Sequence, residues 1–118
     1  MAPSATSVVI LRDTPFPGFD VPTCLSKAAW RGEKGESTCS FDRRQALNAN
    51  VFELEREAAQ GLGYVSVVDL SDALCAAATC APVLRGDLAY RDDHHLTVGA
   101  SSELAATLME RLGARIAR

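Results

Sequence analysis

Both histidines of the chain lie in one short polar segment, together with two aspartates. The segment reads Tyr90-Arg91-Asp92-Asp93-His94-His95-Leu96-Thr97. Within it, Asp92 and His95 have the spacing Asp-x-x-His, and a single turn can place a carboxylate against an imidazole N–H three residues later. The carboxylate then fixes the tautomer and leaves the other ring nitrogen free as a general base. The spacing makes His95 a candidate base and Asp92 its orienting carboxylate.

Two other interpretations of this segment remain open. The first is a solvated polar turn without a chemical role, because an isolated Asp-x-x-His spacing is a weak signal. The second is a metal site made by Asp92, Asp93, His94 and His95, although four adjacent residues rarely converge on one ion without ligands from elsewhere. We expect no metal and no cofactor, and we expect His94 to face solvent.

Four cysteines form two pairs of sequence neighbours. Fourteen residues separate Cys24 from Cys39, and four separate Cys75 from Cys80. Neither spacing gives the paired C-x2-C motifs of a zinc site. We favour the disulfides Cys24–Cys39 and Cys75–Cys80 over four buried free thiols, because each pair joins sequence neighbours across a loop-rich stretch. Disulfides imply an oxidising compartment, although the first residues lack the basic and apolar regions of a secretory signal.

The elements that would position these residues alternate between strand and helix. Apolar runs predict strands at residues 7–11 and 64–70. Between them we expect a long loop rich in proline and glycine, to about residue 42, with one helical turn near residues 25–30. A helix over residues 43–60 should follow. Asp42 is its expected N-cap, and its expected buried stripe is Leu47, Val51, Leu54 and Ala58.

The C-terminal part predicts a small hairpin around Gly86-Asp87 and a last helix. This helix should begin after the N-cap Thr97 and end near Ala117. Its expected buried stripe is Ala105, Leu108, Met109, Leu112 and Ile116. The alternation of strands and helices predicts an α/β fold with a parallel sheet. Two main strands are too few for a complete one, so the chain resembles the second half of an α/β domain.

Composition excludes several classes of protein. The chain has 118 residues, of which 47% are hydrophobic and 23% charged, as expected for one small globular domain. Its net charge of −3 argues against a nucleic-acid partner. Because no run reaches about 18 apolar residues, we expect no membrane span.

Residues 90–97 resemble the Y-R-D-x-x-H-L-T signature of the SGNH-hydrolase-like domains that are fused to the membrane acyltransferase-3 proteins of bacteria. Three further segments agree with that family in the same order, and the resemblance covers about residues 7 to 112. The first segment is a strand and the following loop, matched at residues 8–15, 17–18, 21–22 and 24–25. The second is the next strand and turn, matched at residues 67–70 and 74–75, and the third is Cys80-Ala81-Pro82-Val83.

The resemblance implies the second half of a three-layer, SGNH-hydrolase-like (flavodoxin-like) α/β fold that carries a Ser-Asp-His triad. In this chain His95 would be the base and Asp92 its carboxylate. The activity would be ester hydrolysis or O-acyl transfer on cell-envelope glycans, with the acyl donor delivered by a membrane acyltransferase domain. The location would be extracytoplasmic, either periplasmic or on the outer face of the cytoplasmic membrane, in a membrane-anchored parent. The four cysteines match extracytoplasmic cysteines of the family, which supports the disulfides.

The chain departs from the family at the nucleophile. It contains no Gly-Asp-Ser block, and the blocks that supply the oxyanion hole are also absent. We therefore interpret residues 1–118 as a partial domain that is inactive alone. The alternative is a non-catalytic secreted or surface fragment whose Asp-x-x-His is vestigial.

Two further residues are lesser candidates. Asp13 follows the first strand, at the edge where α/β sheets bind ligands, and is a candidate for the acceptor site. Trp30 lies in the polar loop region, where it would serve as a sugar platform or, as we expect instead, anchor its loop.

Overall fold

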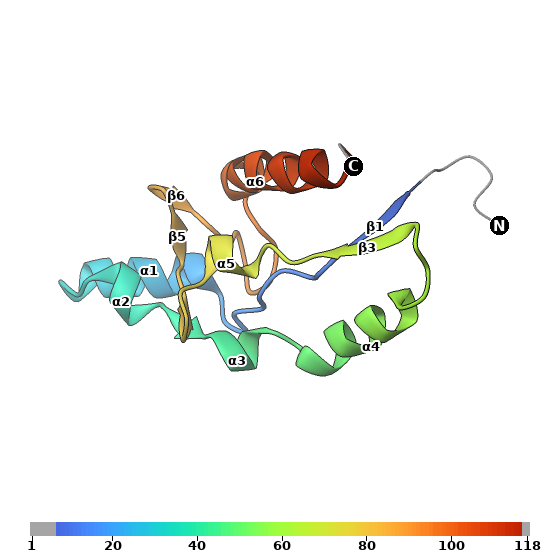
Figure 1. Ribbon diagram of the computed structural model, residues 1–118. Helices are drawn as coiled ribbons and strands as arrows, with labels where there is room; N and C mark the ends of the chain where they lie inside the picture. Colours follow the sequence, from blue (N-terminus) through green and yellow to red (C-terminus); the bar gives the residue numbers. More distant parts are fainter. Residues whose placement is uncertain (1–6, 117–118) are drawn as a thin grey trace.

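The structure, a computed structural model, describes residues 7–116 and confirms an α/β fold with an incomplete parallel sheet. Strands β1 (Val8–Leu11) and β3 (Val65–Val68) pair in parallel, with Val8 opposite Val65. Figure 1 shows this two-stranded sheet as a middle layer between helices α4 (Ala49–Ala59) and α6 (Val98–Ile116). The narrow sheet and the two helices therefore form three layers.

The hydrophobic core lies beside the sheet rather than around it. It forms where α1 (Val21–Trp30), α5 (Ser71–Leu74) and the C-terminal hairpin gather, away from the β1–β3 pair (Figure 1). The rings of Phe41 and Tyr90 meet edge to face at its centre, 5.7 Å apart. The buried members are Val21, Phe41, Ala46, Leu74, Cys75, Cys80, Ala89, Tyr90, Ala100 and Leu104.

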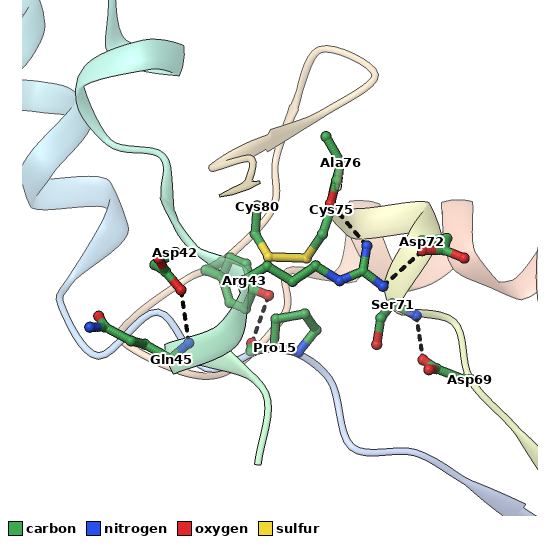
Figure 2. Close-up of a disulfide and its surroundings, with 11 residues drawn as sticks. Pro15, Asp42, Arg43, Gln45, Asp69, Ser71, Asp72, Cys75, Ala76 and Cys80 are labelled. Carbon is green, nitrogen blue, oxygen red and sulfur yellow. Dashed lines mark hydrogen bonds and ion pairs between the residues drawn. A yellow bond between two sulfur atoms is a disulfide. The ribbon is translucent and has the colours of Figure 1, made fainter. Parts of the chain in front are cut away.

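Two disulfides tie this region together, and both predicted pairings are confirmed. Cys24–Cys39 joins α1 to the end of α2 (Gly35–Thr38). Cys75–Cys80 joins the end of α5 to β4 (Thr79–Cys80), which pairs antiparallel with β2 (Phe41–Asp42). Figure 2 shows Arg43 beside the second disulfide, where its guanidinium donates to Asp72 at 2.8 Å and to the Ala76 carbonyl at 2.9 Å.

The segment before residue 42 contains more helix than the single turn expected near residues 25–30, because it holds the ten-residue helix α1 and the short helix α2. The side chain of Asp20 caps α1 by accepting a hydrogen bond from the Thr23 N–H at 2.9 Å. Pro22 lies in the first turn of α1, where a helix tolerates proline because its missing N–H has no intrahelical partner. The proline therefore marks a helix start here rather than a loop.

The expected helix over residues 43–60 is split. Asp42 does cap a helix, as predicted, because it accepts from the Gln45 N–H at 3.0 Å. That helix, α3 (Arg43–Ala46), stops after one turn, and Asn48 caps α4 by accepting from the Val51 N–H at 3.1 Å. The break rotates the expected stripe, so Val51 is 48% and Leu54 65% exposed. No residue of α4 is buried.

The C-terminal hairpin is present, with its turn one residue earlier than expected. Strands β5 (Val83–Leu84) and β6 (Asp87–Leu88) flank Arg85 and Gly86. Both turn residues have positive φ, 49° and 84°, as a two-residue type I′ turn requires.

Helix α6 begins as predicted but presents a neighbouring face to the core. The Thr97 hydroxyl oxygen accepts from the Ala100 N–H at 3.1 Å, which confirms the N-cap. Ala100 and Leu104 are buried, whereas the expected Ala105 and Met109 are exposed. The predicted burial of Ile116 and the predicted end at Ala117 lie outside what the structure describes. Among residues 7–116, no helix combines the length and hydropathy that crossing a bilayer requires.

Candidate functional site

The turn that carries both histidines is anchored by a buried tyrosine. Tyr90 is inaccessible to solvent, and its hydroxyl donates to the Pro15 carbonyl at 2.8 Å. Burial, followed by the negative charge of Asp13, raises the pKa of the Tyr90 phenol far above its usual value. The turn closes on itself through the Arg91 N–H, which donates to the His95 carbonyl at 2.9 Å. The histidines therefore project from a loop whose base is fixed.

Asp92 and His95 are brought together as the sequence predicts. One oxygen of Asp92, Oδ2, lies 2.7 Å from Nδ1 of His95. The other, Oδ1, accepts from the backbone N–H groups of His94 at 2.9 Å and of His95 at 2.6 Å. The N–H of His94, and then that of His95, hold the pKa of the Asp92 carboxyl well below its usual range.

This hydrogen bonding determines which nitrogen of His95 is free. An ionised carboxylate can only accept, so Nδ1 of His95 must carry the proton that it shares with Asp92. In the neutral ring, Nε2 then holds a free lone pair. The geometry is that of an imidazole oriented to take a proton at Nε2.

A second carboxylate–imidazole pair lies beside the first. Nδ1 of His94 is 2.6 Å from Oδ1 of Asp93, and the centroids of the two imidazole rings are 3.8 Å apart. His94 also stacks on Phe16, with ring centroids 5.6 Å apart. The His94 side chain is 45% exposed and that of His95 50%, so exposure does not distinguish them. The expectation that His94 simply faces solvent is therefore incomplete.

Sequence reasoning placed a loop after the first strand but did not predict that this loop supports the histidine turn. The Gly18 N–H donates to the Asp93 carbonyl at 3.2 Å, and the Val21 N–H to the Asp92 carbonyl at 3.4 Å. The clustering of proline and glycine around Phe16 was the only local signal of a structured loop.

Asp13 lies at the start of the same loop, where it is exposed. Its carboxylate accepts from the neighbouring Thr14 N–H at 2.9 Å. This contact joins neighbouring residues and does not involve the histidine turn. Its part in substrate binding therefore stays a prediction.

A set of metal donors is present in the turn. Asp92, His94 and His95 each offer one ligand atom, and these three atoms lie within 4.8 Å of one another. Three of the four residues named by the metal interpretation thus converge in space.

One depression on the described surface is separate from this turn. It has a volume of about 570 Å³ and is lined by three arginines, Arg12, Arg43 and Arg44, with Asp42. Arg12 is already paired with Asp69 at 2.9 Å. Burial raises the pKa of Asp69, but hydrogen bonds from Ser71 and the contact with Arg12 outweigh it and lower that pKa overall. This depression contains paired charges rather than the candidate base.

Trp30 does not anchor its loop, contrary to expectation. It lies at the end of α1 and is 90% exposed. With Ser26, Lys27 and Arg31 it borders a shallow depression of about 350 Å³. The other interpretation, a sugar platform, stays a prediction.

Comparison with known proteins assigns the chain to a family. Residues 2–110 match the family described as SGNH domain (fused to AT3 domains). Searches of the curated proteins and of the solved structures found no match. The match covers nearly the whole sequence, and it includes the strand β1, the strand β3 and the turn that pairs Asp92 with His95. The chain belongs to the family of SGNH domains that are fused to AT3 domains.

Proposed function

We propose that this chain supplies the base and its orienting carboxylate to an SGNH-type acyl-ester hydrolase or O-acyltransferase domain. The observation that carries the proposal is the 2.7 Å contact between Asp92 Oδ2 and His95 Nδ1. His95 takes the proton of a hydroxyl nucleophile at Nε2 and later returns it to the leaving group. Asp92 holds the ring in the productive tautomer and stabilises the imidazolium.

The nucleophile and the oxyanion donors come from a part of the domain beyond residues 1–118 in this proposal. The sequence has no Gly-Asp-Ser. The two-stranded sheet is narrow for an α/β domain, and its Val8 and Leu11 are exposed at the edge of a layered fold. The 118 residues are thus a partial SGNH domain, inactive alone.

The acceptor in this proposal is a cell-envelope glycan, and the acyl group arrives from a membrane acyltransferase domain on the extracytoplasmic side. Two disulfides support an oxidising compartment. The exposed indole of Trp30 supports a glycan as the acceptor, because the C–H face of a pyranose ring packs on an aromatic face.

We expect Trp30→Ala to abolish binding of cell-envelope glycan fragments, measured by saturation-transfer NMR. Unchanged binding would remove Trp30 from the acceptor site.

Labelling with a fluorophosphonate tests whether His95 of this chain acts on a serine that lies outside residues 1–118. The chain alone should show no labelled serine, whereas the chain extended by the preceding segment of its reading frame should be labelled at one serine. In the extended protein, His95→Ala should abolish labelling, and Asp92→Asn should slow it less, because the base transfers the proton and the carboxylate orients it. Labelling of the 118-residue chain that is lost in His95→Ala would contradict the partial-domain assignment. Labelling that survives His95→Ala in the extended protein would contradict the role of His95.

A non-catalytic fragment is the second candidate, and one observation favours it. Asp92 Oδ1 accepts two backbone hydrogen bonds, which gives this aspartate a structural role in the turn without any chemistry. If the Asp-x-x-His is vestigial, no extended protein will be labelled, whichever residue stands at position 95. An upstream reading frame without a Gly-Asp-Ser block would support the same conclusion.

A further inference from the structure

We propose that Asp92 and the Nδ1 atoms of His94 and His95 bind one divalent transition-metal ion of the zinc class, and that this ion switches His95 off as a base. The binding part stands on the donor geometry alone. The inhibitory part rests on the proposed function.

The spacing of the donors fits a tetrahedral ion. With bonds of about 2.1 Å, neighbouring ligand atoms around such an ion are about 3.4 Å apart. Each residue offers one ligand atom, and the three separations between these atoms are all below 4.8 Å. The separation from Asp92 Oδ2 to His95 Nδ1 is 2.7 Å, which is shorter than the required value. Both imidazoles are about half exposed, so rotation of the side chains can bring the three separations to the required value.

The chemistry of the donors selects the class of ion. Imidazole nitrogen with one carboxylate suits Zn²⁺, Co²⁺, Ni²⁺ and Cu²⁺, whereas Mg²⁺ and Ca²⁺ prefer oxygen ligands throughout. Three protein ligands leave a fourth position of the tetrahedron for water, and the side chains of both histidines are about half exposed to solvent. On binding, His94 exchanges its hydrogen bond with Asp93 for a bond to the ion.

Binding at Nδ1 changes the tautomer of His95. Nδ1 now carries the proton that it donates to Asp92. When the ion takes the lone pair of Nδ1, that proton leaves through solvent and one is taken up at Nε2, so the neutral ring is conserved and no net proton is released. Nε2 is then an N–H donor and can no longer accept a proton from a nucleophile. The ion therefore opposes the base role through the same atoms that Asp92 uses to support it.

Calorimetric titration of the 118-residue chain with ZnCl₂ tests the binding. We expect one ion per chain, binding at least tenfold weaker in His94→Ala, and unchanged binding in Glu57→Gln, which removes an exposed carboxylate of α4. MgCl₂ should give no saturable heat. Absence of saturable zinc binding, or equal binding in His94→Ala, would overturn the proposal.

Long-range ¹H–¹⁵N NMR of the histidine rings tests the switch in the wild-type chain and does not depend on any variant folding. We expect His95 to change from Nδ1–H to Nε2–H as zinc is added. A ring that stays Nδ1–H at saturation would overturn the switch.

In the extended protein, zinc should slow fluorophosphonate labelling of the wild type and not of His94→Ala. Zinc-insensitive labelling would refute inhibition alone, whereas no labelling in any extended protein would refute the proposed function and leave the zinc site standing.

Discussion

The disulfide-bonded region, made of α1, α2, α3, α5 and the strands β2, β4, β5 and β6 with their adjoining residues, is packed very differently from the sheet region of this molecule. Every member of the hydrophobic core belongs to the first region or to the helix α6 that covers it. The second region, made of β1, β3 and α4, has one fully buried strand residue, Val68, and a helix without any buried residue. The candidate site is built on the first region, because Tyr90 is part of the core.

The difference shows which contacts the site needs. The turn of residues 90–97 is held by Tyr90, by its own backbone and by the loop that follows β1. None of these contacts involves α4. We therefore expect the Asp92–His95 geometry to persist when the sheet region is perturbed, and to be lost when the disulfide-bonded region unfolds.

Reduction of the disulfides should have the largest effect on stability. In the chain-entropy view, Cys24–Cys39 contributes about 3 kcal/mol and Cys75–Cys80 about 2 kcal/mol. Their sum approaches the whole stability of many small domains, about 5 kcal/mol at the lower end. Urea unfolding followed by circular dichroism should show the reduced chain largely unfolded at 25 °C. Equal midpoints for the oxidised and reduced chains would contradict the importance of this region.

Leucine truncation compares the two regions directly. Leu104 is 6% exposed and Leu54 65%. Leu104→Ala should lower the free energy of unfolding by about 2–4 kcal/mol, and the matched Leu54→Ala by less than about 0.5 kcal/mol. Similar losses for the two variants in urea titrations would mean that α4 is packed in solution.

Removal of one hydroxyl tests how firmly the turn is anchored. Tyr90→Phe leaves the Pro15 carbonyl without its donor in a buried position and should cost about 1–2 kcal/mol. Tyr64→Phe, at a half-exposed tyrosine of the sheet region, is the control and should change stability by less than about 0.5 kcal/mol. A Tyr90→Phe variant as stable as this control would show that the hydrogen bond does not hold the turn.

The smallest effect should appear in the way the free energy of unfolding changes at acidic pH. The N–H groups of His94 and His95 lower the pKa of Asp92 in the folded chain. The ionised carboxylate therefore stabilises the folded chain above the ordinary aspartate pKa of about 3.9. This stabilisation is lost as the pH falls through the lower pKa of the folded state. Asp92→Asn cannot titrate, so its difference from the wild type should shrink as the pH is lowered from 6 to 2. A difference that stays constant over this range would contradict the ionised carboxylate.

Local sequence signals predicted the parts of the fold that depend on neighbouring residues. Asp42 and Thr97 cap helices as expected, and the two cysteine pairs join as expected, because each involves nearby residues. The length of α1 was underestimated because Pro22 occupies a first turn that resembles a loop, and Asn48 was not recognised as a second N-cap.

The candidate site likewise has contacts that the sequence predicts and contacts that it does not. The Asp92–His95 contact follows from a three-residue spacing within one turn. The stack of Phe16 on His94 and the hydrogen bond from Tyr90 to Pro15 join segments more than 70 residues apart in the chain. No local pattern encodes such contacts, so the packing of Phe16 on His94 could be found only in the folded structure.

The tautomer of His95 is the most direct test of the central claim. In the metal-free wild-type chain, ¹H–¹⁵N spectra at neutral pH should show His95 protonated at Nδ1 with Nε2 bare. Asp92→Asn should shift the ring toward Nε2–H, whereas the matched Asp93→Asn should leave His95 unchanged. A wild-type His95 that is mainly Nε2–H, or that responds equally to both variants, would contradict a base oriented by Asp92.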